Sequence, residues 1–325
     1  METCCVCGEN MVPLIKRKDK YLLLHCPHCS FITSSPLPSE EEIRKFYDGY
    51  LFNKPSDEVV QQRDSSLLED VKKIVADFPF YHIKKKVTLL DCGGGTGGYA
   101  QAFAKLGYNV MLIDLDVQAC NYARQKYPDL FTVIAGDALQ YDFKQKFDIV
   151  FCNQLIEHYP DPNSFLTRMK QLLTKDGFLI ITTPNQQTKE FYFRPKWFLS
   201  YIYMVTGFKI QKMPRAIFTF LKKPWLCCDP PRHLHAFNVR NLHRLLEKNG
   251  LVPVTTLTEY SPRQYYSPAK YPDFQVHSWK DIGTLALNSY ARIGVRVLQV
   301  MDTKNTRGAN LVVYAQVREQ GINAL

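Results

Sequence analysis

Apolar and polar positions follow two alternating patterns from residue 87 onward. Short apolar runs, bounded by turn residues, are each followed by a stretch whose apolar residues recur every three or four positions. The first pattern is typical of buried strands and the second of amphipathic helices. Strands are predicted at 87–92, 109–116, 131–138, 147–154 and 178–185, and helices at 99–107, 119–127 and 165–177. This order predicts an α/β fold with a doubly wound, mostly parallel sheet whose site lies at the carboxyl ends of the strands.

The same patterns predict further elements on both sides of this alternation. Helices are expected at 40–47, 64–79 and 284–302, and the last two strands at 252–260 and 310–319. Together with the five central strands, the last two predict a seven-stranded sheet. The long helix at 284–302 lies between the last two strands, and we expect it to cover the site or to form a dimer face.

Composition divides the chain into three predicted parts. Residues 1–33 form a small module that holds half of the ten cysteines, and residues 34–61 form a connector that starts with Pro, Ser and acidic residues. Residues 62–325 form the main domain, with one insertion at 186–232 after the fifth strand and another at 261–309 between the last two strands. The first insertion is helical and aromatic in character.

The first module contains two Cys-x-x-Cys turns, Cys4 to Cys7 and Cys26 to Cys29. Each turn presents two thiolates, and two such turns complete the tetrahedral shell that Zn²⁺ prefers in closed structural sites. We therefore predict a zinc ribbon with these four ligands, whose metal folds a segment too small to bury its own core. Cys5 and His28 lie inside the turns and are expected to be unliganded neighbours. The alternative is that the cysteines pair or stay free.

Composition and charge limit the cellular setting and the partners. The chain is 46% apolar, which supports a sizeable core, and neither a signal-peptide pattern nor a run of about 18 apolar residues is found, so a cytoplasmic location is expected. The net charge of +10 favours anionic partners such as a phosphorylated metabolite, a membrane surface or nucleic acid. Charge alone does not choose among these three.

The stretch LLDCGGGTGG, residues 89–98, fits two glycine patterns. Gly93, Gly95 and Gly98 have the spacing of a dinucleotide loop, whereas Asp91 followed by Gly93, Gly95 and Gly97 has the spacing of S-adenosylmethionine (SAM) enzymes. A carboxylate just before the first glycine is poorly placed beside a pyrophosphate. SAM has no phosphate, and its ammonium and sulfonium groups suit an acidic neighbour, so Asp91 favours SAM.

Two further carboxylates end the next two predicted strands. Asp114 can accept hydrogen bonds from both ribose hydroxyls, a feature that serves NAD and SAM alike. Asp137 can accept from an adenine amino group while the backbone of Ala138 faces the ring. Any one of these residues could instead be a cap or a turn former. Carboxylates at the ends of three consecutive strands are best explained by one cofactor.

With these motifs, residues from about 60 to 255 resemble a class I SAM-dependent methyltransferase with its Rossmann-like sheet. LLDCGGGTGG and IDLD resemble the family's first two motifs, IAGDA its adenine motif, and FDIVFCNQLIEHYPDP its fourth-strand motif. PRHLHAFNVRNLHRLLEKNGL resembles the helix that precedes its sixth strand. With the ribbon in front, the layout is similar to bacterial methyltransferases of small metabolites and surface-glycan precursors.

The resemblance implies a role for each matching residue. Asp91, Gly93, Gly95 and Gly97 would form the methionine side of the pocket, and Asn153 would approach the methionine amino group through its backbone. Leu115 would lie against the adenine face, beside the ribose ligand Asp114. The adenine edge would be bound by Asp137 and Ala138.

Methyl transfer to an activated sulfonium mainly needs alignment of the reactants and exclusion of water. A hydroxyl acceptor also benefits from a general base, and the candidates are His158, just past the fourth strand, and His233 or His235 in PRHLHAF. For His158, packing or helix capping is an equal alternative. We expect transfer to oxygen, on a small metabolite or a glycan or lipid precursor.

Residues 191–228 contain no acidic residue but many basic and aromatic ones. This composition suits a membrane interface, nucleic acid, or a lid over an anionic or amphipathic substrate, and packing on the site is the plainest alternative. We favour the lid, with peripheral membrane contact as an extension, over nucleic acid. The rival functions are an RNA methyltransferase and a non-catalytic binding or regulatory protein with the same fold. Oligomeric state is left open.

Overall fold

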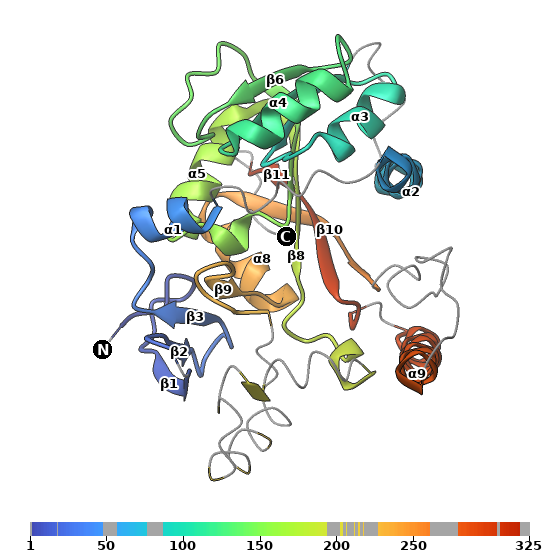
Figure 1. The fold of residues 1–325 in the computed structure, drawn as a ribbon. Helices are drawn as coiled ribbons and strands as arrows, with labels where there is room; N and C mark the ends of the chain where they lie inside the picture. Colours follow the sequence, from blue (N-terminus) through green and yellow to red (C-terminus); the bar gives the residue numbers. More distant parts are fainter. Residues whose placement is uncertain are drawn as a thin grey trace. The chain divides into compact units, whose positions relative to one another are not determined.

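The computed structural model describes residues 2–17, 19–47, 57–76, 87–193, 227–260, 279–303 and 306–318, and the single positions 202, 203, 206, 211, 214 and 217. The chain forms two compact units, and Figure 1 shows the elements of both. The first unit comprises residues 1–37, 183–245 and 256–312, and the second comprises 38–182, 246–255 and 313–325. The boundary between them runs through β8, β10 and β11.

A seven-stranded sheet in the order β10-β11-β8-β7-β4-β5-β6 confirms the predicted α/β fold (Figure 1). The pairs β4–β5, β4–β7, β5–β6 and β7–β8 are parallel. The strands are β4 Thr88–Cys92, β5 Asn109–Asp114, β6 Thr132–Ala135, β7 Phe147–Asn153, β8 Leu173–Pro184, β10 Leu251–Glu259 and β11 Asn310–Val317. Most apolar side chains of β4, β5, β7 and β8 are buried because helices cover such parallel sheets, whereas Val252 and Val254 of the edge strand β10 are exposed.

The helices overlap the predicted ranges, and two of them, α4 and α5, begin at aspartate caps. Asp116 accepts hydrogen bonds from the backbone N–H groups of Gln118 and Ala119 at the start of α4, and Asp161 accepts one from Asn163 at the start of α5. The helices are α1 Glu40–Tyr47, α2 Asp57–Ala76, α3 Gly98–Lys105, α4 Val117–Lys126, α5 Pro162–Leu172, α8 Val239–Lys248 and α9 Trp279–Met301, with short 3-10 turns η1 Ile156–His158 and η2 Glu190–Phe193. Residues 77–79 of the helix predicted at 64–79 lie outside the described residues.

Residues 173–177 differ from the prediction, which extended the helix of α5 to residue 177. The helix ends at Leu172, and Leu173 has an extended backbone and pairs with Phe147 of β7. Gly177 passes so close to this strand that an added Cβ would lie 3.0 Å from the carbonyl oxygen of Phe147. The sheet pairing therefore overrides the helical spacing of the side chains at this position.

The first unit contains a second, four-stranded antiparallel sheet, in the order β1-β2-β3-β9. Its first three strands are β1 Val12–Lys16, β2 Leu22–His25 and β3 Ile32–Ser35, all within the predicted ribbon. The fourth, β9, is the pair His235–Ala236, which pairs with Thr33 and Ile32. The ribbon sheet thus includes a strand from far along the chain, outside the predicted ribbon at 1–33.

Helix α9 packs against η2 within the first unit. Its buried side is formed by Ala291, Gly294 and Val295, and a Cβ added at Gly294 would overlap the ring of Phe193. A second face of α9 exposes the apolar residues Tyr290, Ile293, Val297, Val300 and Met301. None of the helices in the described ranges has the length and apolar content needed to cross a membrane.

Candidate active site

The backbone conformation of the glycine loop between β4 and α3 distinguishes the two glycine patterns that its sequence fits. Gly93, Gly95 and Gly97 have positive φ angles of 74°, 53° and 80°, whereas Gly98 is the first helical residue of α3. The positions that need glycine are thus those of the D-x-G-x-G-x-G pattern. Gly94 is needed for another reason, because an added Cβ would lie 2.7 Å from Oδ2 of Asp91.

Asp91 lies beneath this loop and is only 1% exposed. Its carboxylate accepts a hydrogen bond from the backbone N–H of Ala100 in α3, while Oδ2 is buried and has no hydrogen-bond partner among the described residues. Burial, and then the nearby charge of Asp114, raise the pKa of Asp91 to about 7. A buried, unsatisfied carboxylate oxygen is costly unless a donor or a cation pairs with it. The chemistry of this oxygen therefore fits a cationic ligand.

Asp114 ends β5 and is held by the loop itself. Its Oδ2 accepts a hydrogen bond from the backbone N–H of Gly95 at 2.8 Å, and its Oδ1 accepts one from Asp116 at 2.8 Å. Burial raises the pKa of this carboxyl, although both hydrogen bonds oppose the shift. Leu115, the next residue, is 61% exposed, so an apolar side chain stands in solvent beside a fixed carboxylate. This pair fits a ribose and an adenine face.

The next two strand ends complete the edge of the sheet in the second unit. Asp137 follows β6, and its Oδ1 accepts from the backbone N–H of Leu139 at 2.9 Å. Asn153 ends β7, and its Oδ1 accepts from the hydroxyl of Thr182 in β8 at 2.5 Å. Register pairs Cys92 with both Ile113 and Cys152, so the polar residues that follow these positions lie at one carboxyl-terminal edge. The strand ends thus bring Asp91, Asp114, Asp137 and Asn153 to the same carboxyl-terminal edge of the sheet.

Sequence reasoning missed two residues that fix this edge. Thr182 holds both Asn153 and the next residue, Gln154, whose backbone N–H donates to the carbonyl oxygen of Thr182 at 2.9 Å. Arg168 of α5 donates to the carbonyl oxygen of Ala138 at 3.2 Å and so positions the loop after β6. The positive φ of Gln154, 52°, has no marker in its residue type. Neither role leaves a spacing signal in the sequence.

His158 lies in η1, in the second unit. Its Nε2 is 3.7 Å from Oε1 of Glu157, which is fully buried. The His158 side chain is mostly buried, with a small part of the ring exposed. This geometry suits packing as well as proton transfer, so both predicted roles stay open for His158.

His233 lies in the first unit, in a turn that also contains Asp229. Its Nδ1 is 3.2 Å from Oδ1 of Asp229, within ion-pair distance but without hydrogen-bond geometry, and Arg232 Nη2 is 2.7 Å from Oδ2 of the same carboxylate. Burial alone would raise the pKa of Asp229, but its contacts with His233 and Arg232 lower it below its usual value. An anionic Asp229 beside Nδ1 favours the tautomer that carries its acceptor lone pair on Nε2. Sequence reasoning named His233 but missed Asp229 as its partner.

His235 is a structural residue rather than a candidate base. It is 2% exposed, and its Nδ1 lies 2.9 Å from Oγ1 of Thr33 in the ribbon. Its ring also packs on Phe31, with the ring centres 5.4 Å apart. Of the two histidines of PRHLHAF, His233 thus lies beside Asp229, and His235 is held by Thr33 of the ribbon.

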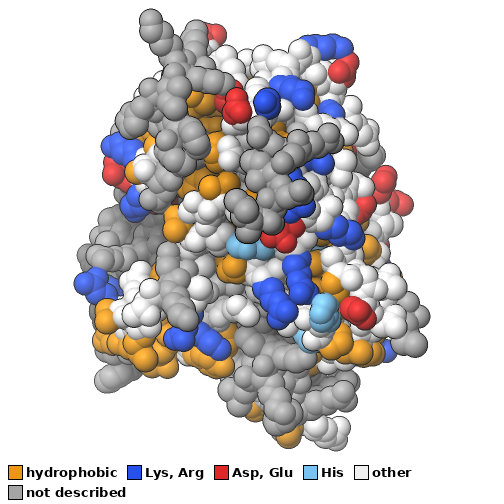
Figure 2. Space-filling view, turned by 180° about the vertical axis from the view of Figure 1, so that it is seen from behind, with side chains coloured by type: hydrophobic (Ala, Val, Ile, Leu, Met, Phe, Trp, Pro, Cys, Tyr) orange, Lys and Arg blue, Asp and Glu red, His pale blue; other side chains and the backbone are white. Residues whose placement is uncertain are grey.

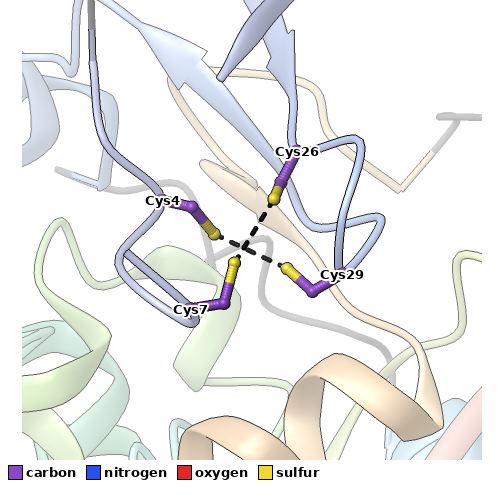
Figure 3. Close-up of side chains that lie close together, drawn as sticks. All are labelled: Cys4, Cys7, Cys26 and Cys29. Atoms are coloured by element: carbon purple, nitrogen blue, oxygen red, sulfur yellow. Dashed lines mark hydrogen bonds between the residues drawn. The ribbon is translucent and has the colours of Figure 1, made fainter. Parts of the chain in front are cut away.

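The four predicted zinc ligands converge in the first unit, and Figure 3 shows their thiols pointing toward a common centre. The Sγ atoms of Cys4 and Cys29 are 3.6 Å apart, those of Cys7 and Cys26 are 3.4 Å apart, and all four lie within 4.8 Å of one another. Thiolates bound at about 2.3 Å to tetrahedral Zn²⁺ are roughly 3.8 Å apart, whereas a disulfide needs about 2.05 Å. The arrangement thus fits a metal better than two disulfides.

Local hydrogen bonds shape both Cys-x-x-Cys turns in the same way. Gly8 donates its backbone N–H to the carbonyl oxygen of Cys4, and Ser30 donates to that of Cys26, and both donors have positive φ angles. The hydrogen bond between Cys4 and Cys29 lowers the pKa of Cys4 and raises the pKa of Cys29, so the two sulfurs share one proton most readily. Cys5 lies outside the set of four.

Most of the basic insertion at 191–228, where membrane contact was predicted, lies outside the described residues. On the face seen in Figure 2, the described Lys and Arg side chains are scattered among acidic and apolar ones. The described surface in this view therefore carries no single basic patch.

Comparisons with known proteins agree with this geometry. The sequence pattern of a family described as a methyltransferase domain matches residues 60–256, more than half of the chain. A ubiquinone biosynthesis O-methyltransferase of Actinobacillus pleuropneumoniae serotype 7 is 34% identical over 116 residues, which cover 33% of this chain and 49% of the relative. A protein of the same name from Cupriavidus pinatubonensis is 29% identical over 150 residues, which cover 42% and 53%. The chain spans roughly half the length of these curated relatives.

A solved structure shares the fold. It is a chain from the complex between the Haloferax volcanii Trm112 methyltransferase activator and a methyltransferase, with a TM-score of 0.53 and 12% identity, covering 86% of this chain and 100% of that one. At this identity the likeness concerns the fold alone. With the family match, the seven-stranded sheet and the SAM-type glycine loop, the chain belongs to the class I SAM-dependent methyltransferases.

Proposed function

We propose that the chain transfers a methyl group from SAM to a hydroxyl oxygen of a small metabolite or of a glycan or lipid precursor. The observation that carries this proposal is the unsatisfied Oδ2 of Asp91 beneath the glycine loop. The names of the relatives, ubiquinone biosynthesis O-methyltransferases, support oxygen as the acceptor atom. The precursor class follows from the resemblance to glycan-precursor enzymes.

In this proposal, SAM supplies an activated methyl group on a sulfonium. Asp91 and the backbone of Gly93, Gly95, Gly97 and Asn153 hold the methionine part. Asp114 holds the ribose, Leu115 packs on the adenine, and Asp137 and Ala138 bind the adenine edge. The buried Asp91 compensates a positive charge in a site of low dielectric, where such a pairing is worth more than in water.

His233 is the proposed general base. SAM would supply the methyl group to the acceptor oxygen, and Nε2 of His233 would accept the hydroxyl proton that the acceptor loses. The anionic Asp229 stabilises the imidazolium that forms and keeps the Nδ1 proton in place. His158 is the alternative base, with Glu157 in the corresponding position.

We also propose that the cluster of Cys4, Cys7, Cys26 and Cys29 binds one structural Zn²⁺. The spacing of the four thiols supports this, and four protein ligands leave no position for a substrate. Metal analysis of the purified protein tests it. About one zinc per chain is expected, and a zinc content near zero in protein with intact thiols would rule it out.

The proposal extends to an amphipathic or anionic substrate and to peripheral membrane contact. The basic and aromatic composition of 191–228 supports it. So does the exposed apolar face of α9, which lies beside Arg292 and Arg296. Flotation with anionic liposomes tests it, and a lack of salt-sensitive association would remove the membrane part.

Transfer of a labelled methyl group from SAM to a panel of hydroxyl-bearing acceptors tests the central proposal. An O-methyl ether survives alkali, whereas a methyl ester is hydrolysed, so the product identifies the acceptor oxygen. Steep salt-dependent binding of RNA, with methylated RNA as the product, would favour the RNA methyltransferase. A titration that shows no binding of SAM at high micromolar concentration would favour a non-catalytic protein.

A further inference from the structure

The turn that carries Asp229 and His233 is held at both ends by residues of the ribbon. The turn itself is closed by a hydrogen bond from the backbone N–H of Arg232 to the carbonyl oxygen of Asp229 at 3.2 Å. All of these contacts lie within the first unit. The ribbon therefore also holds a segment that lies far outside its own residues in the sequence.

Arg17 holds the first end of the turn. It follows β1, is almost fully buried, and donates from Nη2 to the carbonyl oxygen of Pro230 at 3.4 Å. Asp19 fixes the guanidinium, since its Oδ2 accepts from the same Nη2 at 2.8 Å and from Nε at 3.1 Å. This planar, two-pronged contact sets the direction of the Arg17 side chain.

Thr33 and Ser34 of β3 hold the other end. The backbone N–H of Ser34 donates to the carbonyl oxygen of Leu234 at 2.9 Å, directly after His233. The hydroxyl of Thr33 lies 3.4 Å from the same carbonyl oxygen and 2.9 Å from Nδ1 of His235. The short strand β9 then pairs with β3, so the ladder of the ribbon sheet begins where the turn ends.

The second Cys-x-x-Cys turn is tied to the surrounding chain through its backbone. The carbonyl oxygen of Ser30 accepts from the side-chain amide of Gln186 at 3.0 Å, and that of Cys29 accepts from Asn241 at 3.5 Å. Gln186 in turn donates its backbone N–H to Phe237, just past β9, at 2.7 Å. The second Cys-x-x-Cys turn and the segment 229–237 thus belong to one network of hydrogen bonds, which we call the frame.

We infer that the ribbon positions the Asp229–His233 pair, and that Arg17 and Thr33 are positioning residues for the acceptor-side base. The inference rests on the proposed role of His233. A base works only when its nitrogen is held close to the proton it removes, and small displacements reduce the rate strongly. The ribbon's metal would act on the reaction only through this frame.

Thr33→Val and Thr33→Ser form a matched pair, because valine keeps the shape but loses the hydroxyl, while serine keeps the hydroxyl. We expect Thr33→Val to lower kcat about tenfold, with zinc content and SAM affinity unchanged, and Thr33→Ser to stay within about twofold of the wild type. Arg17→Lys, which keeps the charge but loses the planar fork, is the second variant and decides the question if Thr33→Val loses its zinc.

A second readout does not depend on activity. Deuterium exchange at the ring C2–H position, followed by mass spectrometry, reports on each histidine separately. We expect Thr33→Val to speed exchange at His233 while His243, in α8, stays unchanged. If His233 exchanges at the wild-type rate in Thr33→Val and Arg17→Lys, the positioning role is wrong. If exchange changes as expected but no acceptor is methylated by the wild type, the proposed function fails while the frame stands.

Discussion

The glycine loop and the Asp229–His233 turn are both short segments that depend on a carboxylate, but they are fixed in different ways. The loop is held by its own strand ends, since Asp114 accepts hydrogen bonds from Gly95 and Asp116. The turn is held by Arg17 and Ser34, which lie some 200 residues earlier in the chain. The two carboxylates also differ, because the pKa of Asp91 is raised by burial while that of Asp229 is lowered by its cationic neighbours.

This difference indicates how the two regions use charge. Asp91 is left with an unsatisfied oxygen, so its environment is complete only when a cationic ligand binds. Asp229 already has Arg232 and His233 within ion-pair distance, although its Oδ1 accepts no hydrogen bond among the described residues, so it faces His233 before any ligand arrives. The first carboxylate is suited to binding and the second to orienting a proton acceptor.

The largest effect is expected from His233→Gln, which removes the proposed base but keeps a polar side chain of similar reach. Loss of a general base lowers kcat about 10²- to 10⁴-fold, while SAM affinity should stay within about twofold because His233 holds no part of the cofactor. Steady-state kinetics and titration with SAM measure both. The matched variant His158→Gln should cost far less, and the reverse order would transfer the role of base to His158.

Asp91→Asn should weaken SAM binding about 100-fold, because the amide cannot balance a positive charge in a buried site. The same variant should be more stable than the wild type without ligand at pH 8, by on the order of 1–3 kcal/mol. The raised pKa means that an ionised Asp91 costs the folded state free energy at that pH, and the gain should shrink as the pH falls toward 4. Titration with SAM and thermal unfolding at pH 8 and pH 5 measure these effects. Wild-type affinity in Asp91→Asn would exclude Asp91 from the cofactor site.

The pH dependence of SAM affinity should be smaller but diagnostic. Because the pKa of Asp91 is raised to about 7, a proton competes with the cationic cofactor below that pH. Affinity should fall by up to about tenfold between pH 7 and pH 6. Asp91→Asn should show a flat profile over this range, and a wild-type profile that is equally flat would contradict the assignment.

The smallest effect on cofactor binding is expected from loss of the ribbon's metal. Cys26→Ser should lose zinc and lower the thermal stability of the first unit, while SAM affinity stays within about twofold, since the predicted cofactor residues all lie in the second unit. Cys5→Ser is the matched control and should keep its zinc. A large drop in SAM affinity in Cys26→Ser alone would show that the two regions are not independent.

The cofactor side could be predicted from the sequence because its information is local. The strand ends and the glycine pattern lie between residues 88 and 153, and the parallel register brings them together without further signals. The prediction was wrong at 173–177, where pairing of Leu173 with Phe147 overrides helical spacing. Thr182 was missed because its contact with Asn153 depends on the β7–β8 register, which side-chain spacing does not encode.

On the acceptor side, the sequence indicated which residue types could act, but not which residue takes which role. His233 and His235 lie two positions apart and carry the same side chain, so sequence alone could not assign one to Asp229 and the other to Thr33. Strand β9 has only two residues, too few to show any period. Its pairing with β3 is a long-range contact, and nothing in either segment indicates it.

The pairing of β3 with β9 also has a consequence for synthesis of the chain. All four clustered cysteines are made within the first 29 residues, so the thiol cluster can assemble early, whereas the outer edge of β3 waits for residues 235 and 236. Until then an unpaired strand edge is exposed to other nascent chains, a condition that favours aggregation. A fragment that ends after β8 should therefore keep the cysteine cluster but self-associate through two open strand edges, that of β3 and that of β8, whose partner β11 is also missing.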